Sequence, residues 1–204
     1  MKRVYLIVTI AMIFFIGVTP ATALSQRAIP AKAAIVMDDS GTVLYAKFPN
    51  AKLAPASTVK LITAMVVLDN LDPATKVKIS RNAGMVRSIQ PKIYPEEEMT
   101  ASDLLHLALM KSINSAAVAL AEATAGSEQD FVTLMNRKAK EIGANNTLFA
   151  NASGLPKGTQ YTTVSDLALI LKHALSYPLI KEILGTKEYL IRTAEGRDIF
   201  LDNS

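Results

Sequence analysis

Pro55-Ala56-Ser57-Thr58-Val59-Lys60 opens the apolar run 61–71, and this stretch decides how the rest of the chain is interpreted. A proline just before the first turn favours a helix start, because its missing N–H group would have no partner there. The residues that follow are apolar on nearly every face of a helix, which indicates a buried central helix. Ser57 falls in the first turn, and Lys60 lies on the same face one turn later.

The pairing of Ser57 with Lys60 has a chemical meaning. A serine hydroxyl is a weak nucleophile until a base removes its proton, and a lysine amine can be that base if burial lowers its pKa. The start of a helix also places N–H groups and a positive dipole end beside the reacting oxygen. Ser-x-x-Lys alone is weak evidence, since two fixed residues recur by chance about once in a few hundred positions.

Composition narrows the possible functions. The chain has 204 residues, half of them hydrophobic, which is enough for one good-sized core or two small ones. Its net charge of +4 includes Lys2 and Arg3, and the other cations are scattered among acids. That pattern argues against a nucleic-acid partner. With no cysteine and two histidines, the sequence predicts no disulfide, no metal site and no cofactor.

The N-terminus has the pattern of an export signal. Lys2 and Arg3 precede an apolar core over residues 4–18, and Ala21-Thr22-Ala23 matches an A-x-A cleavage site. We therefore expect residues 1–23 to be a signal peptide that is cleaved after Ala23. The mature domain, residues 24–204, would then act in the periplasm or on the outer face of the cell envelope. An uncleaved membrane anchor is the alternative.

Predicted strands lie at both ends of the mature chain, with helices between them. The strands 33–37 and 43–47 flank the turn Asp38-Asp39-Ser40-Gly41, and 188–193 and 198–201 flank Glu195-Gly196. Residues 72–98, broken by proline and glycine, favour loops with short strands such as 76–79. Capping boxes at 100–103, 127–130 and 163–166 launch three helices, which are expected to run through 104–110, 131–142 and 167–175. Two further helices are expected over 115–125 and 178–184. This order predicts an α+β fold with a helical lobe.

A second polar motif, Lys111-Ser112-Ile113-Asn114, interrupts two apolar helices. Taken alone, it is a polar helix–helix connection. Beside a buried serine–lysine pair it acquires a mechanism. Ser112 could pass a proton between Lys60 and a leaving amine, and the Asn114 amide could bind a substrate carbonyl.

Together these motifs resemble the serine D-alanyl-D-alanine carboxypeptidases, the low-molecular-mass penicillin-binding proteins, whose signature is S-x-x-K, S-x-N and K-T-G. The resemblance covers residues 31–201. It implies a β-lactamase/transpeptidase-like antiparallel sheet with packed helices. It also implies that Ser57 is acylated by a peptidoglycan pentapeptide, with Lys60 as the base, Ser112 as a proton relay and Asn114 as a substrate-positioning residue. Penicillins and other β-lactam antibiotics would be covalent inhibitors.

One element of the signature is absent from the sequence. The nearest string to Lys-Thr-Gly is Leu184-Gly185-Thr186-Lys187, which has the wrong order. We therefore expect a domain that is incomplete at its C-terminus, without the last sheet strands and without a membrane anchor. In the family this motif supplies a cation for the substrate carboxylate and an oxyanion donor. Little carboxypeptidase activity is expected of the chain as written.

Three alternatives stay open. A serine β-lactamase would need an acid for deacylation, and Glu141 with Asn145 matches one such spacing. A penicillin-binding-like protein that binds muropeptides without cleaving them is the second. A histidine-based triad is the weakest, because His106 and His173 fall within predicted helices and no Gly-x-Ser-x-Gly turn exists.

Overall fold

The structure, a computed structural model, describes residues 29–203. The chain divides into two units, residues 1–30 and 31–204, and every element named below belongs to the second. The predicted signal peptide, residues 1–23, lies outside the described residues. Within residues 29–203, no helix has both the length and the hydropathy needed to cross a bilayer.

Three antiparallel strand pairs make up the strands of the described chain. They are β1 (Ala34–Met37) with β2 (Val43–Lys47), β3 (Lys76–Lys78) with β4 (Glu98–Thr100), and β5 (Glu188–Arg192) with β6 (Asp198–Asp202). The two predicted terminal hairpins and the short strand near residue 76 are therefore confirmed. In residues 29–203 the three pairs stay separate two-stranded sheets. The first and last lie on different helices, because β1 packs on α6 (Val164–Ala174) whereas β6 packs on α3 (Ala101–Met110).

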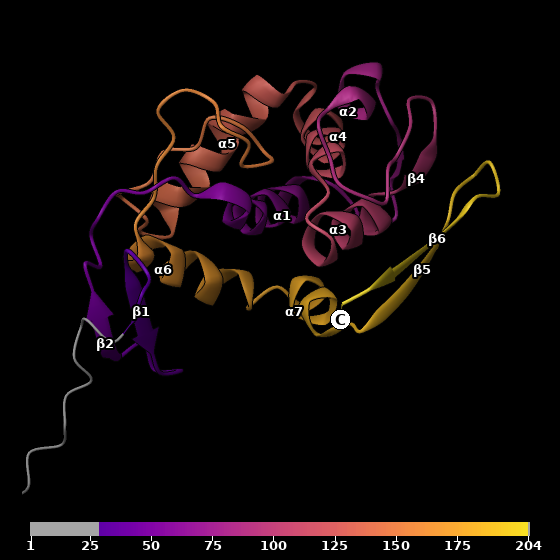
Figure 1. The fold of residues 1–204 in the computed structure, drawn as a ribbon. Helices are drawn as coiled ribbons and strands as arrows, with labels where there is room; N and C mark the ends of the chain where they lie inside the picture. Colours follow the sequence, from indigo (N-terminus) through magenta and orange to yellow (C-terminus); the bar gives the residue numbers. More distant parts are fainter. Residues whose placement is uncertain (1–28, 204) are drawn as a thin grey trace, which may run out of the picture. The chain divides into compact units, whose positions relative to one another are not determined.

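The helices pack around α1 (Val59–Asn70), which follows the short 3₁₀ turn η2 (Ala56–Thr58). Helix α1 contacts α3 and α6 as well as α4 (Asn114–Ala125) and α5 (Glu128–Glu141), and it lies among them in Figure 1. Residues on all sides of α1 are buried, among them Ile62, Met65 and Val67. The prediction of a buried central helix is therefore confirmed.

Local capping explains where three helices begin. The Thr100 hydroxyl accepts the Asp103 N–H at the start of α3, and the Asp103 carboxylate accepts the Thr100 N–H in return. Ser127 caps α5 and Thr163 caps α6 in the same way, each accepting an N–H from three residues on. Each hydroxyl satisfies a donor that the first helical turn would otherwise leave unpaired. The last predicted helix is α7 (Pro178–Gly185).

One short helix was not predicted. Helix α2 (Arg81–Met85) lies where the sequence predicts loops, and Ser80 caps it by accepting the Ala83 N–H. Gly84 lies so close to Pro95 that an added Cβ would come within 2.6 Å of the proline ring. Five residues give too short a period to distinguish a helix from a loop by sequence.

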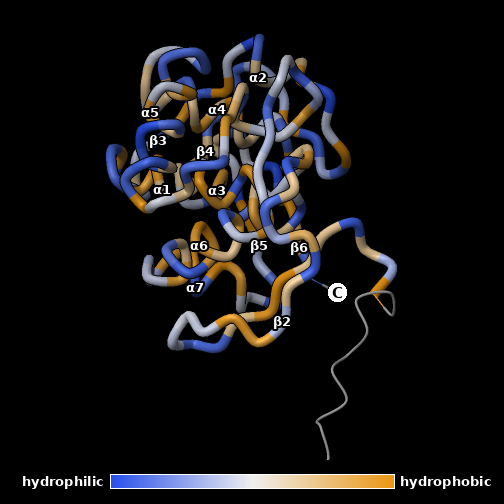
Figure 2. The backbone as a smooth tube through the Cα atoms, turned by 90° about the vertical axis from the view of Figure 1, so that its left-hand side faces the viewer, coloured by the Kyte–Doolittle hydropathy of each residue, from blue (hydrophilic) through white to orange (hydrophobic). Residues whose placement is uncertain are grey.

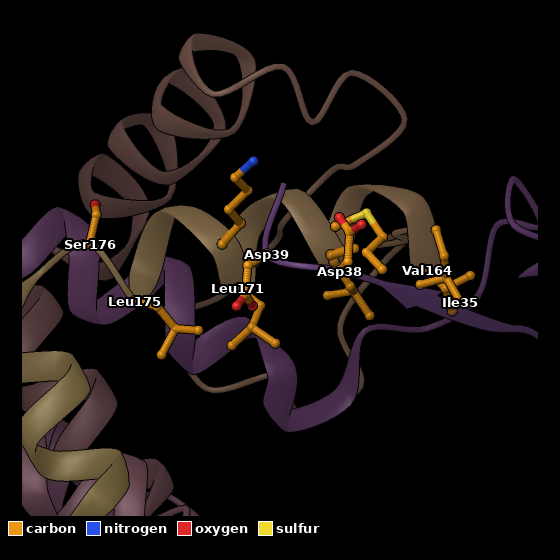
Figure 3. Close-up of a pocket in the computed structure, with 11 residues that line it drawn as sticks. Ile35, Asp38, Asp39, Val164, Leu171, Leu175 and Ser176 are labelled. Atoms are coloured by element: carbon orange, nitrogen blue, oxygen red, sulfur yellow. The ribbon is translucent and has the colours of Figure 1, made fainter. Parts of the chain in front are cut away.

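A cavity of 710 Å³ lies between β1 and α6 (Figure 3). Apolar side chains such as Ile35, Val164 and Leu171 line it, and Asp38 and Asp39 lie among them. The neighbouring strand β2, hydrophobic in Figure 2, leaves Leu44 66% exposed. None of the four predicted site residues lines this cavity.

Candidate active site

The start of α1 exposes Ser57 and buries Lys60. Ser57 lies in the 3₁₀ turn η2, just ahead of the α-helix in which it was expected. The Thr58 hydroxyl and N–H both donate to the Pro55 carbonyl, at 2.5 and 3.3 Å, and this closes the turn. Ser57 is exposed to solvent, whereas Lys60, at the start of the α-helix, is only 3% exposed.

Backbone strain lies directly before the candidate nucleophile. Ala56 has a φ of 47°, a left-handed conformation that a non-glycine residue adopts only where its surroundings enforce it. Gly154 packs against it so closely that an added Cβ would lie 1.9 Å from the Ala56 carbonyl oxygen. The position of Ser57 therefore depends on a glycine far along the chain.

The Lys60 ammonium is surrounded by three oxygen acceptors. Its Nζ donates to the Ser153 carbonyl at 2.7 Å, to Asn114 Oδ1 at 2.8 Å and to Ser57 Oγ at 3.3 Å. An ammonium has three N–H donors, so these contacts use all of them. Burial lowers the pKa of Lys60 to about 8, because removal from water disfavours the charged form.

The segment that carries the Ser153 carbonyl is fixed from two helices. The Thr63 hydroxyl of α1 donates to the Ala152 carbonyl at 2.8 Å, and Glu128 of α5 accepts the Ala152 N–H at 3.1 Å. Sequence reasoning gave Ser153 no role, because a backbone carbonyl has no signature in the residue type. The only available signal was the resemblance of residues 149–154 to the family.

Ser112 lies in the break between α3 and α4, as the sequence predicts. It lines a cavity of 270 Å³ together with Ser57 and Lys60, and its φ of 56° is left-handed. In the described part of the chain its hydroxyl makes no hydrogen bond to either residue. The preceding Lys111 pairs instead with Asp202 at the end of β6.

Asn114 is the first residue of α4, one residue earlier than the predicted helix start. Its Oδ1 faces Lys60, and its Nδ2 donates to the Arg87 carbonyl at 2.9 Å. The structure thus brings together all four predicted site residues, three of them by direct hydrogen bonds. It also adds Arg87 and Ser153, which no sequence motif indicated.

The residues of the alternative mechanisms lie in other settings. Glu141 is an exposed residue at the end of α5, within 3.5 Å of Arg137 and 3.8 Å of Lys138. His106 is buried, stacked on Tyr189 with ring centroids 3.5 Å apart, and its Nδ1 lies 2.8 Å from the Ser102 carbonyl. Among residues 29–203, neither His106 nor His173 hydrogen-bonds Ser57 or Lys60. Both histidines lie within helices, as the sequence predicted, His106 in α3 and the exposed His173 in α6.

Comparison with known proteins gives consistent matches. A sequence profile of the D-alanyl-D-alanine carboxypeptidases matches residues 20–203. The D-alanyl-D-alanine carboxypeptidase DacF of Bacillus subtilis is 38% identical over 186 residues, and a D-alanyl-D-alanine endopeptidase of Escherichia coli is 38% identical over 172. The crystal structure of a D-alanyl-D-alanine carboxypeptidase from Mycobacterium tuberculosis superimposes with a TM-score of 0.81 at 31% identity. The predicted fold class is therefore confirmed.

These matches cover most of this chain but less of its relatives. The alignments include 88% and 82% of the chain, yet only 48% of the Bacillus protein and 55% of the Escherichia protein. The structural match covers 86% of this chain and 67% of the Mycobacterium protein. The chain thus spans about half the length of the two curated relatives.

Proposed function

The chain belongs to the D-alanyl-D-alanine carboxypeptidase family, and on that basis we propose that it removes the terminal D-alanine from peptidoglycan stem peptides. The reaction would proceed through an acyl-enzyme on Ser57, outside the cytoplasm. The observation that carries the proposal is a buried Lys60 amine, with a pKa of about 8, 3.3 Å from an exposed serine hydroxyl.

The geometry suggests how Lys60 would act as the base. When the ammonium loses one proton, it keeps two N–H groups and gains a lone pair. The two shorter bonds, to the Ser153 carbonyl and Asn114 Oδ1, would retain those N–H groups. The lone pair would then face the more distant Ser57 Oγ, which is the proton donor in acylation.

The proposed reaction has an acylation step and a deacylation step. Ser57 Oγ attacks the carbonyl carbon of the penultimate D-alanine and gives its proton to Lys60. The peptide C–N bond breaks, and terminal D-alanine leaves with a proton relayed by Ser112. Water then hydrolyses the ester. The N–H groups at the start of α1 would stabilise the developing oxyanion, and Asn114 would hold the substrate carbonyl.

A covalent label tests this proposal. The protein is incubated with a fluorescent penicillin and the labelled peptide is mapped, because a label accumulates even where turnover is slow. We expect one labelled residue, Ser57, and no label in Ser57→Ala or Lys60→Ala. Lys60→Arg should also fail, since a guanidinium stays protonated and cannot act as the base. Lys76→Gln, on an exposed strand, is the control and should label normally.

Release of D-alanine from a D-Ala-D-Ala peptide and cleavage of a cross-linked muropeptide are then compared. Labelling that survives Ser57→Ala would overturn the assignment of the nucleophile. Muropeptide binding without labelling would favour a binding protein instead. Steady hydrolysis of penicillin would favour a β-lactamase.

A further inference from the structure

Helix α4 has a cap that comes from outside its own sequence. The residue before its first turn is Ile113, whose side chain cannot accept a hydrogen bond. The Ser88 hydroxyl, 26 residues upstream, accepts the N–H of Asn114 at 2.7 Å and that of Ser115 at 3.0 Å. Ser88 therefore performs for α4 what an N-cap residue ordinarily does from the adjacent position.

The segment that carries Ser88 also fixes the side chain of Asn114, through the neighbouring Arg87. The Arg87 carbonyl can only accept, and it takes an N–H from Nδ2. The protonated Lys60 can only donate, and it faces Oδ1. Both neighbours therefore demand one orientation of the amide. The second N–H of Nδ2 is left over, and it is the donor that the proposed mechanism needs for the substrate carbonyl.

Residues 80–88, which include α2, also hydrogen-bond the far half of α4. Glu122, about two turns further along α4, accepts from the Ser80 hydroxyl at 2.5 Å and from Asn82 Nδ2 at 2.6 Å. Residues 80–88 are thus tied to α4 at both ends. A displacement of α4 would carry Ser88 with it, so the contact between Ser88 and Asn114 is maintained.

We propose that Ser88 is a positioning residue for the reaction at Ser57. Ser88 holds Asn114, and Asn114 Oδ1 in turn orients the Lys60 amine. This inference rests on the proposed function. Without the Ser88 hydroxyl, the first N–H groups of α4 lose their acceptor and the Asn114 backbone is no longer held. The amide can then turn away from Lys60, and one of the two short bonds that aim the amine is lost.

The test compares Ser88→Ala, Ser88→Thr and Thr100→Ala in the full chain. Thr100→Ala also removes a helix cap, that of α3, but Thr100 touches neither Lys60 nor Asn114. Acylation by a fluorescent penicillin should be roughly ten- to a hundredfold slower in Ser88→Ala, the range expected for a misplaced catalytic group. Ser88→Thr keeps the hydroxyl and should restore the rate, and Thr100→Ala should leave it unchanged.

A second measurement does not depend on acylation. The Lys60 amine is titrated by NMR in the same variants. Loss of the Asn114 acceptor should lower the pKa of Lys60 in Ser88→Ala but not in Thr100→Ala. Equal rates and equal Lys60 titrations in Ser88→Ala and wild type would overturn the inference, whereas a label that persists in Ser57→Ala would overturn the proposed function instead.

Discussion

Helices α1 and α4 both begin at the candidate active site, and both begin irregularly. A non-glycine residue with left-handed backbone precedes each, Ala56 before α1 and Ser112 before α4, and neither helix has a side-chain cap from its own N-cap residue. The supports differ. A tight van der Waals contact with Gly154 holds the start of α1, whereas the Ser88 hydroxyl holds that of α4.

The difference between the two supports predicts how each would fail. Close-packed atoms leave no room for even one added methyl group, so the Gly154 contact should fail abruptly. Hydrogen bonds can lengthen, be replaced by water or be restored by another hydroxyl, so the Ser88 contact should fail gradually. Substitutions at Gly154 and Asn114, and the pH dependence of acylation, test this difference.

The largest effect is expected from Gly154→Ala. The new Cβ would lie 1.9 Å from the Ala56 carbonyl oxygen, and the residue would keep a φ of +84°. Left-handed backbone costs alanine about 1–2 kcal/mol, and overpacking adds about 1–3 kcal/mol. We expect the free energy of unfolding, measured in urea, to fall by about 3 kcal/mol, with acylation of Ser57 lost.

Gly196→Ala is the matched control for that prediction. Gly196 has the same left-handed backbone, with a φ of +83°, but an added Cβ there would meet no atom within 4 Å. Only the conformational cost of about 1 kcal/mol should appear, with acylation unchanged. Equal losses in the two variants would mean that the contact with Ala56 does not hold the nucleophile.

The same contrast shows what could be predicted from sequence. Thr100, Ser127 and Thr163 act within one turn of their own helices, so the local pattern predicted those three helix starts. Ser57 in η2 and Lys60 in α1 lie three residues apart, and their side chains meet at 3.3 Å, so their spacing was informative as well. The predicted start of α4 was one residue late, because its cap is Ser88 and Ile113 gives no local signal.

The remaining features depend on contacts between distant segments. The Ser153 carbonyl and the Arg87 carbonyl are backbone groups, and every residue type carries one. The role of Gly154 rests on a neighbour almost a hundred positions earlier in the chain, and glycine also occurs in ordinary turns. Pairing between one hairpin and another is also long-range. The sequence therefore predicted the two terminal hairpins from their turns, but not that they stay in separate sheets.

The second prediction concerns Asn114→Asp at the start of α4. This substitution replaces the amide by a carboxylate of the same shape. The carboxylate would have no N–H for the Arg87 carbonyl, and its charge beside Lys60 would raise the pKa of the amine. Less neutral amine would then be available at pH 7, and acylation there should fall by roughly ten- to a hundredfold, as one to two units of pKa predict.

Raising the pH distinguishes this cause from a general loss of structure. Acylation by Asn114→Asp should recover in part above pH 9, because the amine can then lose its proton. Asn145→Asp makes the same substitution at an exposed position and should behave as wild type. If Asn114→Asp is slow but has the wild-type pH profile, the amide does not act through Lys60.

The smallest effect is the pH dependence of the unmodified protein. Burial lowers the pKa of Lys60 to about 8, so the amine is mostly protonated at pH 7 and mostly neutral at pH 9. Only the neutral form has a lone pair for the Ser57 proton. The acylation rate should therefore rise with pH, by roughly tenfold between pH 7 and pH 9, with its midpoint near 8.

Ser88→Ala loosens the hydrogen bond from Lys60 to Asn114 and should change this pH profile in two ways. The midpoint should shift to lower pH, because the charged amine loses an acceptor. The plateau rate should fall, because the neutral amine is no longer oriented toward Ser57. A flat profile in wild type would mean that some group other than Lys60 takes the proton.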